Sequence, residues 1–263
     1  GAVLAAGGCE VDAVTLAAIV SGSVGEVAVF RRPVAAVVST GDELADADAP
    51  LHPGQIHDSN RLALTRLLAD AGARCEPLGR AKDEPGALRA MLERGLSADV
   101  LCVVGGMSKG THDYVPQTLE ELGVEWLVTS LKLKPGKPTR IGRSPQGGWV
   151  LGLPGNPVSC AICFLLFGAA IVRGLTGRGA GRPVMLRGVA QSDLPENGER
   201  PMFHPARWSA AAHGEILVRP HAWRGSGDPF VLAGANALIH RVAHAAATPR
   251  GEAVDFVPIG MPQ

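Results

Sequence analysis

Several common features are scarce or missing in this sequence, and their absence narrows its possible functions. The 25 Lys+Arg residues balance 25 Asp+Glu residues, so the formal net charge is zero. This balance argues against broad electrostatic binding to nucleic acid or to an acidic membrane. The longest apolar stretch, residues 158–172, is interrupted by Ser159 and Gly168 and is shorter than a membrane-spanning helix. We therefore expect no nucleic-acid or membrane partner, and we interpret the stretch as a buried helix.

A paired set of cysteines is also missing. The 5 cysteines are an odd number and lie in apolar runs, which indicates reduced, buried thiols in a cytoplasmic protein. Cys160 and Cys163 have the spacing of a redox or metal motif, but the surrounding segment is apolar and core packing is the better interpretation. The chain begins at Gly1 without an initiator Met, a basic leader or a cleavage signal. It is either processed or a fragment of a longer protein.

What is present is an alternation of apolar strands and amphipathic helices. The pattern predicts strands over residues 34–39, 74–78, 99–104, 126–133, 139–141 and 149–153. It predicts helices over residues 60–70, 87–96, 114–122 and 157–174. This order is typical of an α/β layer fold with a mostly parallel sheet, in which ligands bind at the carboxyl ends of the strands.

The pattern changes on both sides of this α/β region. After a Gly/Pro/Arg linker at residues 178–183, short β-like runs predict a small all-β domain closed as a barrel, with strands over residues 184–189, 216–219, 237–241 and 254–257. Residues 1–32 contain one helix (13–20) and one strand (26–30), which do not make a complete domain. We therefore expect an incomplete central domain (1–32), an α/β domain (33–179) and a β domain (180–263). Glycines in residues 177–182 would let the β domain pivot.

Residues 150–159 lead from an apolar strand through Pro-Gly directly into a helix. Asn156 is a good N-cap, because its side-chain oxygen can accept a hydrogen bond from an unpaired N–H of the first turn. Pro157 suits the first helical position, where a missing N–H costs nothing. The free N–H groups and the positive end of the helix dipole would then face the loop and favour an anion.

A second glycine-marked loop, residues 103–113, follows an earlier strand. Its glycines allow close approach of a ligand to the backbone, and Lys109 and Asp113 bring charges of both signs. Two such loops, together with residues 39–44 after another strand, can meet at one edge of the sheet. They predict a site for a phosphate-bearing small molecule.

Five ordered motifs resemble those of one family. They are STGDEL (39–44), GQIHDSN (54–60), GGMSKGTHDY (105–114), LKPGKP (133–138) and LPGNPVS (153–159). Together they resemble the MoeA family of molybdopterin molybdenumtransferases, and the E domain of gephyrin is similar. The resemblance implies a Mog-like α/β sandwich domain that binds molybdopterin, followed by a β-barrel domain.

The resemblance also implies a reaction. Family members insert molybdate into adenylylated molybdopterin and release AMP, with Mg²⁺ as the cofactor. It further implies a homodimer in which the β-domain loop around Ser226 faces the active site of the partner subunit, and a molybdopterin adenylyltransferase as a possible partner. Two alternatives stay open: a molybdopterin-binding or scaffolding protein without catalysis, and a related molybdopterin adenylyltransferase or nucleotide hydrolase.

The resemblance assigns roles to individual residues. Asp113 and Glu43 match acidic positions that would hold Mg²⁺ and act in catalysis, although Asp113 would equally cap a helix and Glu43 could be a solvated loop charge. Lys134 and Lys137 flank a rigid Pro-Gly turn, which suits molybdate or phosphate. The remaining positions implied to bind the cofactor are Gly105, Gly106, Ser108, Gly110, Pro154, Gly155, Asn156, Pro157 and Ser226.

The sequence departs from the family pattern at two places. Lys109 stands where the family more often has a small apolar residue, and Pro205 stands where it often has an arginine, for which Arg207 could substitute from a shifted position. In the DSN motif, helix capping explains Asp58 or Ser59 about as well as ligand contact does. The three histidines near the motifs, His52, His57 and His112, are interpreted as loop residues.

Overall fold

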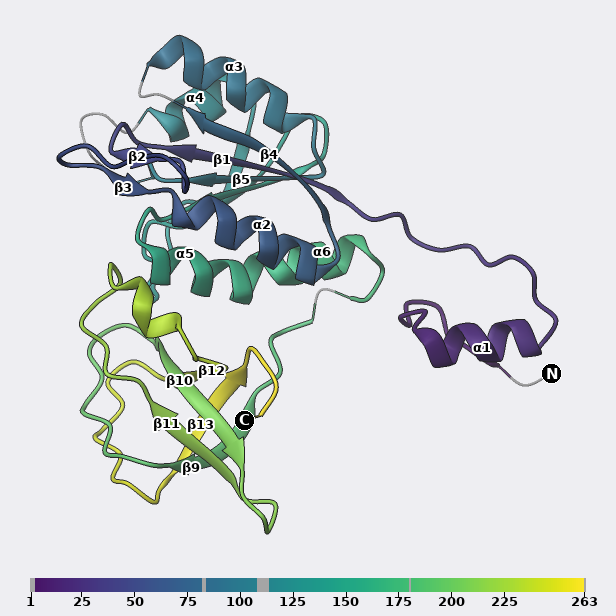
Figure 1. Ribbon diagram of the computed structural model, residues 1–263, viewed down its shortest axis with the longest axis vertical. Helices are drawn as coiled ribbons and strands as arrows, with labels where there is room; N and C mark the ends of the chain where they lie inside the picture. Colours follow the sequence, from purple (N-terminus) through teal and green to yellow (C-terminus); the bar gives the residue numbers. More distant parts are fainter. Residues whose placement is uncertain (1–2, 82–83, 108–113, 180, 263) are drawn as a thin grey trace.

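The computed structural model describes residues 3–81, 84–107, 114–179 and 181–262. Its central element is a six-stranded sheet in the order β4-β1-β5-β8-β7-β6 (Figure 1). The strands are β1 (Val34–Thr40), β4 (Arg74–Ala81), β5 (Val100–Val104), β6 (Glu125–Val128), β7 (Arg140–Arg143) and β8 (Trp149–Leu153). The first four in the order are parallel, and β7 runs antiparallel to both of its neighbours.

Helices cover both faces of this sheet, as the alternating sequence pattern predicts (Figure 1). One face carries α3 (Pro85–Leu96) and α4 (Val115–Glu121) over a core that includes Leu88, Leu92 and Leu119. The other face carries α2 (Ser59–Ala71) and a continuous helical run made of α5 (Pro157–Cys163), the π-helical η1 (Phe164–Gly168) and α6 (Ala169–Leu175). The strands β1, β5 and β8 are almost wholly buried because apolar layers lie on both sides of them.

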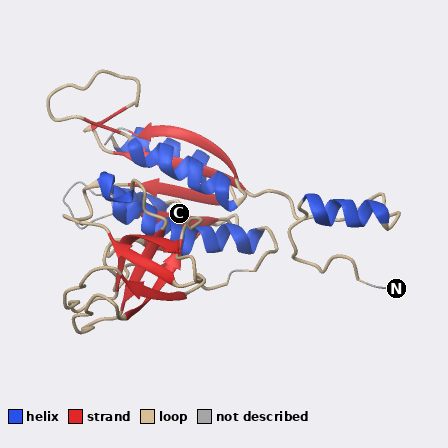
Figure 2. Cartoon of the chain, turned by 60° about the horizontal axis from the view of Figure 1, so that its bottom comes forward, coloured by secondary structure: helices blue, strands red, loops and turns tan. Residues whose placement is uncertain are grey.

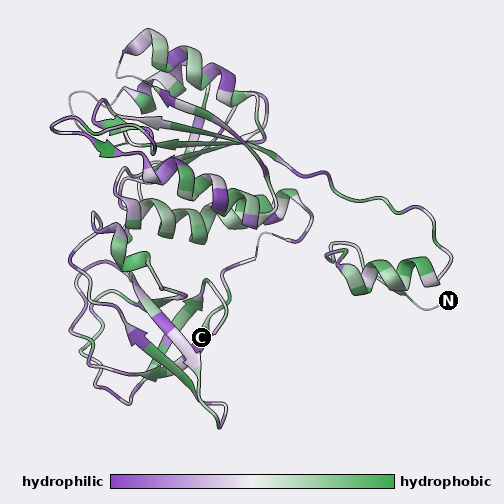
Figure 3. Ribbon diagram, in the orientation of Figure 1, coloured by the Kyte–Doolittle hydropathy of each residue, from purple (hydrophilic) through white to green (hydrophobic). Residues whose placement is uncertain are grey.

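The helical run from Pro157 to Leu175 matches the helix predicted over residues 157–174 to within one residue. Its 19 residues are long and apolar enough to cross a membrane by length and composition alone. The run instead packs between the sheet and the second domain, and Figure 3 colours most of it as hydrophobic. Val158, Ile162, Phe164 and Val172 have no exposed surface, so the interpretation as a buried helix is confirmed.

The second domain is a closed barrel in the order β10-β11-β9-β13-β12. Its strands are β9 (Leu186–Ala190), β10 (Met202–Ala210), β11 (Ile216–Pro220), β12 (Ala237–Arg241) and β13 (Ala253–Pro258), and the short 3-10 helix η2 (Pro229–Leu232) lies beside α5. Figure 2 shows the barrel strands set apart from the large sheet, with helices between them. The predicted β domain is therefore confirmed, although the longest barrel strand, β10, was not predicted.

The barrel and the α/β domain share one apolar core. Val231, Leu238 and Val257 of the barrel domain belong to the same buried cluster as Val158, Ile162 and other residues of the α5–α6 run. At the start of the linker, Arg178 donates a hydrogen bond of 2.7 Å to the Ala71 carbonyl. These contacts hold the barrel against the α/β domain in this arrangement, and pivoting at the glycines of 177–182 stays a prediction.

The region before β1 contains α1 (Ala13–Ser21), close to the predicted helix, but residues 26–30 form no strand. A strand requires a hydrogen-bonded neighbour, and this segment runs extended toward β1 without pairing (Figure 1). Only Ile19 of α1 is buried. Two short strands that were not predicted, β2 (Leu44–Ala45) and β3 (Ile56–His57), pair with each other.

Candidate functional site

Three predicted loops meet at the carboxyl edge of the sheet. Gly105 and Gly106 follow β5 with φ of +87° and +62°, a region that favours glycine. A Cβ atom on Gly105 would lie 2.7 Å from the Thr40 carbonyl oxygen, at the end of β1. On the other side, the Gly105 N–H donates to the Leu153 carbonyl at 3.1 Å. The glycine loop is therefore held between the ends of β1 and β8.

The Pro154–Pro157 loop lies directly against this glycine loop. A Cβ atom on Gly155 would lie 3.8 Å from the Gly105 Cα atom. The Asn60 side-chain amide donates to the Gly155 carbonyl at 2.6 Å and so braces the loop from α2. Asp58 caps α2 by accepting from the Arg61 N–H at 3.1 Å, and it also pairs with the Arg61 guanidinium. Of the two interpretations of the DSN motif, Asp58 therefore serves as a helix cap, whereas Asn60 contacts the Pro154–Pro157 loop.

Asn156 occupies the N-cap position of α5, but its side chain makes no capping hydrogen bond. Its amide donates instead to the Ser226 hydroxyl of the barrel domain at 3.0 Å. The Ser226 carbonyl accepts from the Val158 N–H at 3.2 Å, so the barrel loop satisfies a first-turn donor that we expected Asn156 or an anion to satisfy. Ser226 thus contacts the Asn156 of its own chain.

The Lys134–Lys137 turn is fixed from two directions. Gly136, with φ of +117°, lies so close to α5 that an added Cβ atom would be 2.2 Å from the Cys163 sulfur. On the barrel side, the Lys134 N–H donates to the Pro201 carbonyl at 2.8 Å. The Phe203 N–H donates to the Lys134 carbonyl at 2.9 Å. Both lysine side chains are exposed at the tip of this fixed turn.

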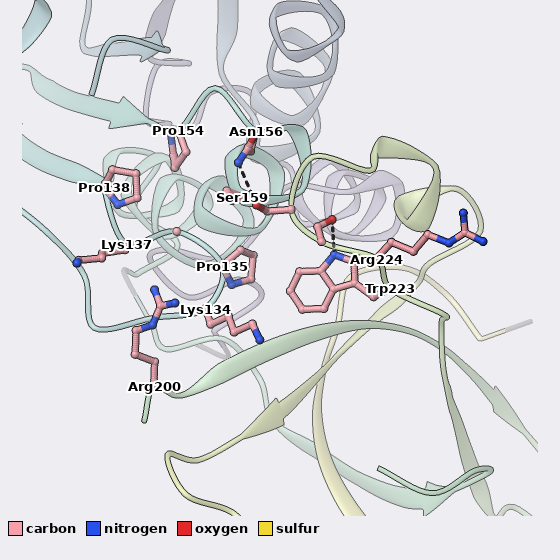
Figure 4. Close-up of a pocket in the computed structure, with 13 residues that line it drawn as sticks. Lys134, Pro135, Lys137, Pro138, Pro154, Asn156, Ser159, Arg200, Trp223 and Arg224 are labelled. Atoms are coloured by element: carbon pink, nitrogen blue, oxygen red, sulfur yellow. Dashed lines mark hydrogen bonds between the residues drawn. The ribbon is translucent and has the colours of Figure 1, made fainter. Parts of the chain in front are cut away.

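These elements enclose a pocket of about 380 Å³ between the two domains (Figure 4). Its lining consists of Lys134, Pro135, Gly136, Lys137, Pro138, Pro154, Asn156, Ser159, Arg200, Trp223, Arg224, Gly225 and Ser226. Four of these residues are cationic and none is a carboxylate. No carboxylate of the described residues pairs with any of the four cations. The pocket is therefore suited to an anion.

Aromatic residues of the barrel form one wall of the pocket. The Lys134 amine lies 6.0 Å from the centre of the Trp223 ring, within cation–π range. The Trp223 N–H donates to the Gly225 carbonyl at 2.6 Å, which fixes the ring (Figure 4). Behind it, the His204 ring meets Trp223 edge-on at 5.3 Å. Burial, together with the nearby charge of Lys134, lowers the pKa of His204.

The predicted site residues do not all fall in the described part of the chain. Ser108, Lys109, Gly110, His112 and Asp113 lie outside the described residues. Pro157 begins α5 as expected. The described residues contain no group of three or more His, Cys, Asp or Glu side chains placed to hold a metal ion.

Glu43 lies in the loop after β1 and is exposed. Its carboxylate folds back over Gly41, where an added Cβ atom would be 2.5 Å from the Glu43 Oε2 atom. This places one carboxylate beside Gly41, directly after the end of β1. Of the histidines interpreted as loop residues, His52 lies in a loop, where its N–H donates to Gln55. His57 instead lies in the short strand β3, and its ring hydrogen bonds to the Asp46 carbonyl at 3.0 Å.

The cysteines are packing residues, with one exception. Cys102, Cys160 and Cys163 are buried, and burial raises the pKa of Cys163 to about 11, so its thiol stays protonated. The expectation that all thiols are buried is wrong for two cysteines. Cys75 is half-buried at the edge of the core, and Cys9 is exposed because little of its N-terminal segment packs against the domain.

Pocket residues that the sequence analysis missed come mostly from the barrel. Pro205 is buried in β10, and Arg207 is exposed and outside the pocket, so Arg207 does not substitute at this site. Arg200 and Trp223 line the pocket instead. Because β10 itself was not predicted, no sequence signal placed Arg200 at the mouth of a site.

The geometry defines a class: an α/β domain with glycine loops at its sheet edge, joined to a barrel that completes a cationic pocket. Two family models match the same two units. Residues 36–174 match the family described as a probable molybdopterin binding domain, and residues 187–259 match the MoeA C-terminal region, domain IV.

Individual relatives agree with these matches. The chain is 35% identical over 236 residues to a molybdopterin molybdenumtransferase of Nostoc sp., covering 87% of this chain and 53% of the relative. It is 30% identical to the Haemophilus influenzae molybdopterin molybdenumtransferase, covering 83% and 54%. The crystal structure of a molybdopterin biosynthesis moea protein from Pyrococcus horikosii matches with a TM-score of 0.83 at 28% identity, covering 98% of this chain and 62% of that one.

The chain therefore belongs to the MoeA family, whose α/β domain is a probable molybdopterin binding domain. It spans about half the length of the relatives that it matches, 53% and 54% of the two named above.

Proposed function

We propose that this chain acts in molybdenum cofactor biosynthesis by inserting molybdate into adenylylated molybdopterin, with release of AMP. The relatives' name, molybdopterin molybdenumtransferase, supports the reaction class. The observation that carries the proposal is the pocket with four cations and no described carboxylate partner, which adjoins the glycine loops through Pro154 and Asn156.

The proposed division of labour follows from the chemistry of each part. The glycine edge, with Gly105, Gly106 and Gly155, allows the phosphates of the substrate to approach the backbone. Lys134 and Lys137 hold the molybdate oxyanion in the neighbouring pocket. The two substrates would then meet near Asn156, where the two parts join.

We propose Glu43 and Asp113 as ligands of Mg²⁺. Mg²⁺ is usually bound through one or two carboxylates plus substrate phosphates, and Glu43 supplies one such carboxylate near the sheet edge. When bound, the ion would neutralise phosphate charge. Ser108 and Gly110 would extend the phosphate contacts of the same loop.

We also propose a cytoplasmic homodimer that receives its substrate from a molybdopterin adenylyltransferase. The contact between Ser226 and Asn156 lies within one chain, at 3.0 Å. We therefore revise the expected shared site: each chain supplies its own Ser226 loop, and complementation between Asp113 and Ser226 variants is not expected.

The test is AMP release from adenylylated molybdopterin, measured on the full-length gene product with and without molybdate and Mg²⁺. We expect release that requires both ions, and a sharp loss in Asp113→Asn with an unchanged melting temperature. Absence of AMP release under all four conditions, from a folded protein, would refute the proposed reaction.

A further inference from the structure

The outer face of the barrel carries two arginines that lie directly opposite each other. The register of β10 and β11 pairs Arg207 with Arg219, and both residues are exposed. Side chains at such positions have Cβ atoms about 5 Å apart, and like charges there destabilise a sheet. No carboxylate of the described residues forms an ion pair with either arginine. The part of the chain that the structure describes therefore does not relieve the repulsion between them.

Another cross-strand pair on the same barrel has the usual arrangement of charges. The register of β9 and β13 places Arg187 opposite Asp255, and the two side chains form an ion pair of 3.0 Å. The pair of Arg207 and Arg219 costs folding stability where the pair of Arg187 and Asp255 adds to it. A local cost without an internal gain is typical of a surface that serves a function.

An exposed aromatic residue accompanies the two arginines. Arg219 and Phe230 both line an open hollow of about 450 Å³ at the end of β11, together with Pro220, Ala222 and Asp228. Phe230 is 82% exposed, although phenylalanine is among the residue types most often buried. Aromatic residues and arginine are enriched in protein–protein interfaces relative to the rest of a protein surface. The hollow therefore has the composition of an interface.

Hydrogen bonds and the shared core hold this hollow in place. Val231 lines it and belongs to the buried cluster that joins the two domains. The His221 ring donates to the Val231 carbonyl at 2.8 Å, and the His221 N–H donates to the Pro205 carbonyl at 3.0 Å. Asp228 accepts from the Phe230 N–H at 3.1 Å. A partner would meet a preformed surface, which lowers the entropic cost of binding.

We propose that Arg207, Arg219 and Phe230 form a docking surface for a protein partner, which contributes an acidic segment that carries an apolar side chain. Carboxylates of the segment would neutralise the two guanidinium groups, and its apolar side chain would cover Phe230. The Asp228 carboxylate and the apolar side chains of the hollow favour such a segment over nucleic acid, because a carboxylate repels phosphates.

The docking surface adjoins the cationic pocket through one loop. Ala222 and Asp228 line the hollow, whereas residues 223–226 between them line the pocket. A protein docked on this surface would lie beside the pocket, which suits a partner that delivers a substrate or receives a product. The inference concerns the partner alone and does not depend on the proposed reaction.

The test begins with a displayed library of random 12-residue peptides, selected on the full-length protein. We expect the enriched peptides to combine Asp or Glu with Phe, Leu or Trp. Fluorescence anisotropy then gives the Kd of one labelled enriched peptide for the wild type and for the variants. Phe230→Ser should weaken its binding by about 10-fold, the effect of losing one aromatic contact residue at an interface.

Arg219→Glu separates docking from folding. It places a carboxylate opposite Arg207, so the melting temperature should rise by about 1–3 °C while the affinity for the peptide falls by about 10-fold or more. Arg187→Glu is the matched control on the same barrel. It places a second acid opposite Asp255, so its melting temperature should fall while it binds the peptide like the wild type.

Three results would overturn the inference. The first is a selection that enriches no peptides, or peptides without an acidic bias. The second is an enriched peptide that binds Arg219→Glu as tightly as the wild type, or a melting temperature of Arg219→Glu below that of the wild type. The third is a labelled 12-nucleotide single strand that binds the wild type more tightly than any enriched peptide and loses affinity in Arg219→Glu, which would assign the surface to nucleic acid.

Discussion

Gly136 is the position where a single added methyl group should destabilise the protein most strongly. The residue is buried between Pro135 and Lys137, and its φ of +117° is rarely adopted by residues with a side chain. A Cβ atom there would lie 2.2 Å from the Cys163 sulfur. Cys163 is fully buried, so its side chain cannot move out of the way toward solvent. Gly136→Ala therefore combines backbone strain with an overlap in the core.

The expected cost is the sum of two terms. Overpacking of a dense core costs about 1–3 kcal/mol, and the left-handed conformation costs a side-chain-bearing residue about 1 kcal/mol more. We expect Gly136→Ala to lower the free energy of unfolding by about 2–4 kcal/mol, measured by urea denaturation. Because the turn carries Lys134 and Lys137, molybdate affinity should fall as well.

A double-mutant cycle separates the two terms. Cys163→Ala removes the sulfur that the new methyl group would meet, so the combined variant should be less destabilised than the sum of the single variants by about 1–2 kcal/mol. Gly147→Ala, at a positive-φ glycine with an open environment, controls for backbone strain alone. A Gly136→Ala protein within 0.5 kcal/mol of wild type, or a cycle without coupling, would refute the overlap.

Three further predictions follow from other contacts. Lys134→Ala together with Lys137→Ala should weaken oxyanion binding in calorimetry but change stability by about 0.5 kcal/mol or less, because both side chains are exposed; a wild-type affinity would leave them as surface charges. Hydrogen bonds from Arg31 and the Val34 N–H lower the pKa of Asp99, so its stabilisation is present above the unfolded pKa and is lost as the pH falls through the folded value. Asp99→Asn should cost about 1 kcal/mol at pH 7, discounted for the exposed arginine, and flatten the acid limb of a urea midpoint-versus-pH curve; an unchanged limb contradicts this. Burial lowers the pKa of His204 below its ordinary 6.5, so the unfolded chain binds the extra proton first and stability falls as the pH drops below about 6.5; His204→Gln should reduce that fall, and an equal fall in both proteins would count against it.

The elements that the sequence predicted well are those whose signals are local. Residues 34–39 form a continuous apolar run, and the structure buries β1 between two helical layers. In α2, both ends follow known capping rules: Asp58 accepts from the first turn, and Gly72 ends the helix with φ of +103°. The convergence of the glycine loops also followed from a general rule, that parallel strands end at one edge.

The failures have a common physical cause, which is that tertiary partners outweighed local preference. Asn156 has the sequence context of a helix cap, but its side-chain amide donates a hydrogen bond to the hydroxyl of Ser226, 70 positions away, instead of capping the helix. β10 was missed because Pro205 argues against a strand. In the barrel, Pro205 pairs with Leu238 of β12 and lies just before the ladder with β11 begins at Ala206, so its missing N–H is tolerated there.

The apolar core that continues from the α5–α6 run into the barrel has a consequence for how the chain holds a ligand. Two domains joined only by a linker would lose stability independently, and a pocket between them would open at little cost. Here Val231, Leu238 and Val257 of the barrel pack into the core of the α/β domain, so opening the pocket would expose that core to water. The apolar contacts that fold the chain therefore also hold Lys134 near Trp223, and an anion that bound in this pocket would stabilise the two domains together.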